Sequence, residues 1–282
     1  MSVRIVQSKQ NNRVKELRRA LANPVREKGG PAGIEGLNLL FEAVRSGLRI
    51  LCVFASEGNE GLLEKLALPA ETEVLIVPQD VLRSALTTET PQPIAALVEP
   101  PDWTWHDVLK SGNDGMKGTV PLLLVLSGLQ DPGNLGTIVR SAEAFGAQGV
   151  LCLPGTVSAW NPKAVRASAG SIFRVPVLTA KAKDSIELLR ESGLKMYAAT
   201  ARAAQPVDLA NLAEPVAILI GNEGNGVPEE LAAQADGAVT IPCPGPVESL
   251  NAAVAASVLL YEASRQRLMQ RGGPLNHRGG SR

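Results

Sequence analysis

The chain has 282 residues, of which 45% are hydrophobic, 20% charged and only 3% aromatic. This length allows two modest domains, and the aliphatic composition favours α/β layers over a β-sandwich. The 28 basic and 28 acidic residues cancel. That balance alone argues against nucleic acid, because phosphate neutralisation supplies much of such affinity. No apolar run approaches the ~20 residues of a membrane span, so we expect a cytoplasmic protein that does not enter a membrane.

The distribution of charge softens the argument against nucleic acid. Residues 1–28 hold eight Lys and Arg against two Glu, and five Arg follow Glu262. Basic ends around a neutral middle permit an RNA partner, although solvated surfaces explain the same charges.

Cysteine and histidine usage predicts no metal site. Cys52, Cys152 and Cys243 are far apart and form no CxxC pair, so we expect buried free thiols rather than zinc ligands or disulfides. His106 lies in a Pro/Gly-rich stretch and His277 in a Gly/Arg tail. A His-ligated metal or a His-based triad is therefore not expected.

The first hundred residues alternate helical and strand patterns. A basic amphipathic helix is predicted first, and buried apolar runs are separated by further helical periods. This order indicates a small α/β domain over residues 1–100. The predicted helices cover residues 11–21, 38–47, 60–68 and 79–86, and the predicted strands cover 49–56, 73–78 and 93–100.

A stretch rich in Pro and Gly, residues 101–119, has no sustained period and is expected to be a linker. The domain that follows, residues 120–270, alternates fully apolar strands with amphipathic helices, which is typical of a parallel, doubly wound sheet. Its last helix begins near Asn251, and residues 271–282 are expected to form a disordered tail. The predicted strands cover 121–128, 149–155, 195–200, 215–221 and 237–241, and helices are predicted at 134–147 and 184–193.

Polar residues follow three of these strands, in residues 129–147, 221–231 and 242–255. Each segment runs through Gly and Pro into a helix, so backbone groups are exposed where a ligand can use them. The glycines match neither a dinucleotide fingerprint nor a P-loop. The polar side chains of these segments that could serve a site are Asn134, Arg140, Glu223, Ser249 and Asn251. Such side chains are better suited to orienting groups and holding anions than to activating water.

Together the three segments resemble the motifs of the SpoU (TrmH-type) branch of the SPOUT RNA 2′-O-ribose methyltransferases. The matching stretches are NLGTIVRSAEAFGA, ILIGNEGNGVP and IPCPGPVESLNAAVAASVLLYE, in the family's order and spacing. The likeness covers about residues 120–265. The first hundred residues resemble, more weakly, the family's ribosomal-protein-like RNA substrate-binding domain.

The resemblance implies a parallel-sheet methyltransferase domain with a deep trefoil knot, and a homodimer. It implies S-adenosyl-L-methionine as the cofactor and an RNA ribose 2′-hydroxyl as the methyl acceptor. Ribosomal RNA is preferred over tRNA, because a substrate domain before the catalytic one fits the ribosomal members better.

Residue roles are carried over from the same motifs. Gly221, Ile241 and Leu250 are placed around the cofactor, with Thr200 as a weaker candidate. Asn134 and Arg140 would serve the target ribose, and Glu223, Ser249 and Asn251 would shape the site. Four of these residues also have a structural alternative: Arg140 could pair with Glu143, Glu223 could cap the helix near Pro228, and Ser249 or Asn251 could cap the last helix.

Family accounts often call the motif arginine a general base. Arg is normally protonated throughout, so our alternative hypothesis is that Arg140 holds a substrate phosphate and stabilises the developing alkoxide.

Two other function classes stay open at this point. One is a catalytically silent RNA-binding relative, and the other is an unrelated Rossmann-type oxidoreductase or hydrolase. The small residues of the last helix, from Ala252 to Ser257, are hypothesised to allow close packing against the knot and a second subunit.

Overall fold

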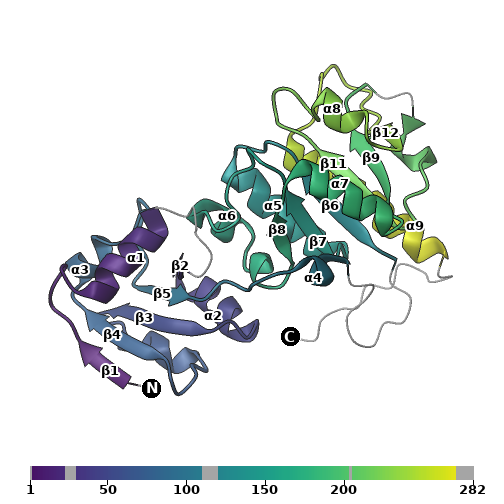
Figure 1. Ribbon diagram of the computed structural model, residues 1–282. Helices are drawn as coiled ribbons and strands as arrows, with labels where there is room; N and C mark the ends of the chain where they lie inside the picture. The colour runs from purple at the N-terminus through teal and green to yellow at the C-terminus, as the bar shows by residue number, and fades with distance from the viewer. Residues whose placement is uncertain (1, 23–29, 110–119, 203–204, 271–282) are drawn as a thin grey trace. The chain divides into compact units, whose positions relative to one another are not determined.

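The computed structural model describes residues 2–22, 30–109, 120–202 and 205–270 (Figure 1). The chain divides into two compact units. The first combines Met1–Asp102 with Ser158–Arg174, and the second combines Trp103–Val157 with Val175–Arg282. The tail expected at 271–282 lies outside the described residues.

The first unit is built on a five-stranded sheet of order β1-β4-β3-β5-β2. Strands β1, β4 and β3 are parallel, and β5 and β2 run antiparallel to their neighbours. Its elements are β1 (Ser2–Ile5), α1 (Asn12–Ala22), β2 (Ala32–Glu35), α2 (Leu37–Arg45), β3 (Ile50–Ser56), η1 (Glu60–Lys65), β4 (Glu73–Val77), α3 (Gln79–Arg83), β5 (Ile94–Val98), α6 (Pro162–Ala167) and η2 (Ser171–Phe173).

Amphipathic periodicity explains how this unit packs. Helix α1 buries Val14, Leu17 and Leu21 against Phe54 and Leu75 of the sheet. The helix predicted at 60–68 is instead the short 3-10 helix η1, which buries no residue. Without burial to support propagation, so short a segment does not reach a full α-helix.

Segment 158–174 lies in sequence between two parts of the second unit, but it packs with the first unit. Val165, Ile172 and Phe173 are buried, and Trp160 stacks on Phe173 at a centroid distance of 6.0 Å. The Arg174 guanidinium donates to Glu42 at 2.7 Å. The chain therefore passes between the units three times.

The second unit is a seven-stranded, wholly parallel sheet of order β10-β12-β9-β11-β6-β7-β8. This confirms the predicted parallel α/β class. Its elements are α4 (Trp105–Leu109), β6 (Leu122–Leu126), α5 (Pro132–Ala144), β7 (Gly149–Cys152), β8 (Val177–Thr179), α7 (Ala182–Glu191), β9 (Lys195–Ala199), β10 (Gln205–Pro206), η3 (Val207–Leu209), β11 (Val216–Ile220), α8 (Glu229–Ala232), β12 (Gly237–Thr240) and α9 (Ala252–Gln270).

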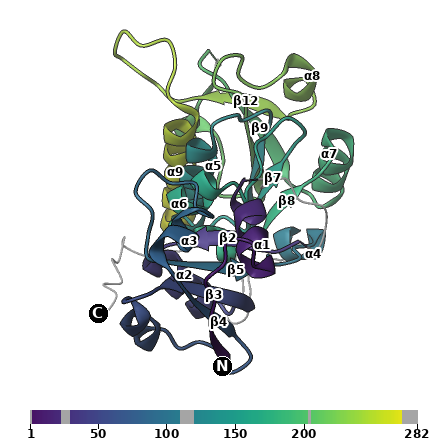
Figure 2. The same cartoon turned by 90° about the vertical axis from the view of Figure 1, so that its left-hand side faces the viewer.

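Helices cover both faces of this sheet, which is why its central strands β6 and β11 are apolar throughout. Figure 2 shows α5 and α9 on one side of the strands and α7 on the other. Strands β6 and β11 are fully buried. Helix α4 lies within the stretch expected to be a linker, and its Val108 is buried in the core under α7.

The thiols differ in exposure. Cys52 and Cys152 are buried, and burial raises the pKa of each to about 12, so neither forms a thiolate near neutral pH. The expectation of a buried thiol is wrong for Cys243, which is exposed. It lies in a loop whose residues from Pro242 to Ser249 are all exposed in the single chain.

The last helix is buried on one face only. Ala256, Leu260 and Ala263 are fully buried, whereas Val254 and Tyr261 expose 49% and 48% of their surface. The all-round apolar pattern of its sequence thus leaves an uncovered apolar edge in the single chain.

A polar cluster fixes the second half of this helix. Glu262 accepts two hydrogen bonds of 2.7 Å from the Arg265 guanidinium and one of 2.8 Å from Gln266. Gln266 in turn donates to the carbonyl of Ala210. The Arg265 hydrogen bond, and to a lesser extent that of Gln266, lowers the pKa of the Glu262 carboxyl from its ordinary value of 4.5.

We predict that Glu262→Gln lowers the melting temperature at pH 7 by ~2–6 °C, because the charged hydrogen bonds are lost. Because the pKa of Glu262 is lower in the folded protein than in the unfolded chain, its carboxylate stabilises the fold at pH values above the ordinary carboxyl pKa. This stabilisation is lost as the pH falls through the folded-state pKa. The difference between the two proteins should therefore shrink towards pH 3, as thermal melts across pH would measure. Glu214→Gln, at an exposed pair with Lys195, is the control and should change the melting temperature by less than about 1 °C.

Candidate active site

Three loops meet at the carboxyl edge of the seven-stranded sheet. Because β6, β11 and β12 are parallel members of one sheet, the segments that follow them lie at the same edge, where ligands of doubly wound folds bind. Helix α5 begins directly there. Asp131 caps it by accepting from the backbone N–H groups of Gly133 and Asn134, and Pro132 occupies its first turn.

The side chain of Asn134 joins all three segments. Its Nδ2 donates to Glu223 Oε1 at 2.8 Å, and its Oδ1 accepts from Asn251 Nδ2 at 3.1 Å. Asn251 also caps α9, since its Oδ1 accepts from the N–H groups of Ala253 and Val254. The capping alternative is thus compatible with a site role, because the two ends of one amide do both.

A residue that sequence reasoning passed over, Asn222, shapes the second loop. Its Oδ1 accepts from Gly224 N at 2.8 Å, and its Nδ2 donates to the carbonyl of Gly128 at 2.9 Å. A backbone bridge pairs Asn222 with Gly226. Asn followed by Gly two residues on is the signal of an Asx-turn, which could have identified this role.

A cavity of about 720 Å³ opens among the loops that follow β9, β11 and β12. It is large enough for a cofactor-sized ligand. All four residues predicted to contact the cofactor line it: Thr200, Gly221, Ile241 and Leu250. Apolar side chains such as Ile220, Val239 and Leu259 form part of its wall.

The remaining predicted residues lie at two places. Glu223 and Ser249 line the cavity, and Asn134 and Asn251 are bonded to Glu223 directly or through one amide. Arg140 lies further along α5 and is exposed. Within the described residues its side chain forms neither a hydrogen bond nor an ion pair, so the alternative pairing with Glu143 is not observed.

Glu223 does not cap α8. That helix starts after Pro228 without a side-chain capping bond, and Glu223 instead accepts from Asn134.

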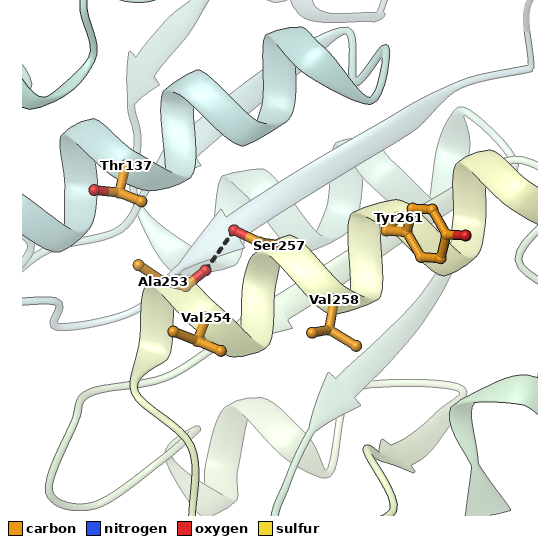
Figure 3. Close-up of a pocket in the computed structure, with 6 residues that line it drawn as sticks. All are labelled: Thr137, Ala253, Val254, Ser257, Val258 and Tyr261. Atoms are coloured by element: carbon orange, nitrogen blue, oxygen red, sulfur yellow. Dashed lines mark hydrogen bonds between the residues drawn. The ribbon is translucent and has the colours of Figure 1, made fainter. Parts of the chain in front are cut away.

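A second, shallower hollow of about 290 Å³ lies along α5 and α9 (Figure 3). Thr137 lines it from α5, and Ala253, Val254, Ser257, Val258 and Tyr261 line it from α9. Ser257 turns its hydroxyl to the carbonyl of Ala253, so the hollow is almost wholly apolar. We call it the α5/α9 groove. Arg140 lies one turn along α5 from Thr137, beside this groove.

The described residues contain no group of three His, Cys, Asp or Glu side chains that could hold a metal ion. The histidine that the structure describes, His106, lies on α4, and His277 is outside the described residues. None of the described helices is long and apolar enough to cross a membrane.

The sequence matches two family models. The SpoU rRNA Methylase family matches residues 121–261, and the MRM3-like substrate binding domain matches residues 11–96. The first match contains the three loops of the site, and the second covers most of the five-stranded unit.

Individual relatives extend over nearly the whole chain. The 23S rRNA (guanosine(2553)-2'-O)-methyltransferase RlmP of Bacillus subtilis is 30% identical, over 91% of this chain and 97% of its own length. An AdoMet-bound rRNA methyltransferase from Sinorhizobium meliloti is 30% identical, covers 93% of this chain and 98% of its own, and has a TM-score of 0.79. The SpoU methyltransferase AviRb from Streptomyces viridochromogenes, also bound to AdoMet, is 27% identical, with coverages of 92% and 99% and a TM-score of 0.78.

We predict that Gly221→Ala opens the second loop. An added Cβ would lie 1.8 Å from the backbone carbon of Gly226, an overlap that no side chain can relieve. The melting temperature should fall by about 5 °C or more, and hydrogen exchange at the Asn222 and Gly226 amides should accelerate. Gly245→Ala, where nothing lies within 4 Å of the added atom, is the matched control; equal effects of the two would contradict this account.

Proposed function

The chain belongs to the SpoU rRNA methylase family, and from this premise we propose that it transfers a methyl group from S-adenosyl-L-methionine to a ribose 2′-hydroxyl of ribosomal RNA. The observation that carries the proposal is the Asn251–Asn134–Glu223 hydrogen-bonded chain beside a cavity lined by the four expected cofactor residues. The tRNA and silent-relative alternatives have less support, since RlmP is named for 23S rRNA.

The cavity fits the cofactor chemically as well as in size. Its apolar wall suits the uncharged adenine ring, while the backbone of the lining residues Gly221, Ile241 and Leu250 offers hydrogen-bonding groups to the nucleoside. When bound, the cofactor supplies a sulfonium methyl group for in-line displacement. The residues of the chain then have one main task, which is alignment.

Asn134 is the centre of that alignment. Both ends of its side-chain amide have partners, so its orientation is fixed before substrate arrives. Glu223 is held by Asn134 and faces the cavity that would contain the sulfonium, which places a negative charge near a positive one. Ser249 adds a hydroxyl to the same wall.

Arg140 is proposed to act on the RNA. Its guanidinium is exposed and has no partner within the described residues, as expected for a group that binds a substrate phosphate. A guanidinium presents a fixed fork of donors and stays protonated. We therefore assign it to holding the phosphate beside the target ribose and stabilising the developing alkoxide, with phosphate or water accepting the proton.

We predict that Arg140→Ala lowers methyl transfer by about 10²–10³-fold or more, while S-adenosyl-L-methionine affinity is unchanged. Transfer of labelled methyl to 23S rRNA measures the first, and calorimetry the second. Arg140→Lys should stay strongly impaired because an ammonium lacks the planar fork; a near-normal rate would contradict the bidentate role. Lys195→Ala, at the opposite end of β9, removes a positive charge away from the site and is the control.

We also propose that the α5/α9 groove is the interface of a homodimer. Its support is the exposed apolar edge of α9, where Val254 and Tyr261 face solvent in the single chain, next to an apolar hollow. Neither Ala255 nor Ala256 can test this surface, because Ala255 lines the cofactor cavity and Ala256 is fully buried. The trefoil knot stays a prediction of the resemblance, and the cytoplasmic location stays a prediction from the sequence.

If the groove is the dimer interface, Val254→Glu should weaken the dimer. A carboxylate in an apolar interface should raise the dimer dissociation constant by about one hundredfold or more, as sedimentation equilibrium would measure. The control is Leu209→Glu, which changes a side chain that is 71% exposed on η3 and outside the groove. If Val254→Glu stays as dimeric as this control, the groove is not the interface.

A further inference from the structure

A basic side chain of the cofactor cavity, Arg202, has no part in the function proposed above. Arg202 follows β9 and lines the cavity together with Thr200, Gly221 and Leu250. Within the described part of the chain, it is the one Lys or Arg among the lining residues. Its side chain is exposed and forms no hydrogen bond or ion pair there.

The backbone that carries Arg202 is held by three hydrogen bonds, of which two join it to β12. Arg202 N donates to Thr200 Oγ1 at 3.2 Å, and Thr240 Oγ1 donates to the carbonyl of Ala201 at 3.2 Å. Thr200 N donates to the carbonyl of Val239 at 3.0 Å. The turn is therefore tied to β12, while the guanidinium remains available to a ligand.

The charges of the lining residues define what that ligand presents. Two acids, Glu223 and Glu248, accompany Arg202 around the cavity. S-adenosyl-L-methionine carries a sulfonium and an ammonium, which the acids can attract, and a single anionic group, the carboxylate of its methionine part. An Arg fork matches a carboxylate with two parallel N–H···O bonds.

We propose that Arg202 binds the α-carboxylate of the cofactor's methionine part and so favours ligands that carry this amino-acid part. This proposal rests on the function proposed above. Arg202 then orients the cofactor from the side opposite the acceptor. Strand β11 lies between β9 and β6 in the sheet, so Arg202 is separated by a strand from the Asn134 segment. Its place in the cavity wall favours the cofactor over an RNA phosphate.

Calorimetry with two nucleosides tests this contact. S-Adenosylhomocysteine keeps the carboxylate, whereas 5′-methylthioadenosine retains the adenosine and the thioether but lacks the whole amino-acid part. Arg202→Ala should weaken S-adenosylhomocysteine by about ten- to one hundredfold and leave 5′-methylthioadenosine affinity unchanged. Arg202→Lys should recover part of the loss, because it restores the charge without the fork. Lys195→Ala should alter neither affinity.

Three results would overturn the carboxylate contact alone. The first is unchanged S-adenosylhomocysteine affinity in Arg202→Ala, and the second is an equal loss for both nucleosides, which would place Arg202 on the adenosine or on the loop's structure. The third is intact nucleoside binding with weaker binding of 23S rRNA, which would make Arg202 a phosphate contact. If the unmodified protein binds neither nucleoside, the proposed function itself fails, and the inference with it.

Discussion

The amide of Asn134 connects its own segment to two others, which are 89 and 117 residues away along the chain. One end of the amide donates to Glu223 and the other accepts from Asn251, so a reversed amide would lose both bonds. The loops after β6, β11 and β12 are thereby fixed relative to each other before any ligand binds. For a transfer that depends on alignment, this pre-organisation is the main requirement. The cavity, the cap of α9 and Arg140 on α5 are all arranged around this amide.

The polar start of α9 follows from this link. A helix that buries Ala256 and Leu260 completely still has unpaired N–H groups at its first turn. Asn251 satisfies two of them with its oxygen and uses its nitrogen for Asn134. One side chain, that of Asn251, therefore both caps the helix and joins the residues of the site.

Much of the fold could be predicted because the main strands are continuous apolar runs, as at β6 and β11. The short strands β2, β8 and β10 carry no such pattern and depend on neighbours that only the fold supplies. The same holds for segment 158–174, whose buried Ile172 and Phe173 pack in a unit far away in sequence. For the site, strand-end polarity indicated the loops and the family motifs indicated residue roles. Neither could show that Asn134 bonds to Glu223, or that Arg202 borders the cavity, because these depend on the order of strands in the sheet.

Alignment at the carboxyl edge also requires that α9 does not move along the sheet. Its first turn is tied to Asn134, while near its other end Arg267 donates to the carbonyls of Val120, Pro121, Leu212 and Glu214. These carbonyls precede β6 and β11, at the amino edge of the two central strands. A helix of 19 residues thus spans the sheet and is attached at both edges. Because a helix stretches little, the amino-edge attachment determines how far Asn251 reaches at the opposite edge. The distance between the cap and the second loop is then set by the whole domain rather than by the loops alone.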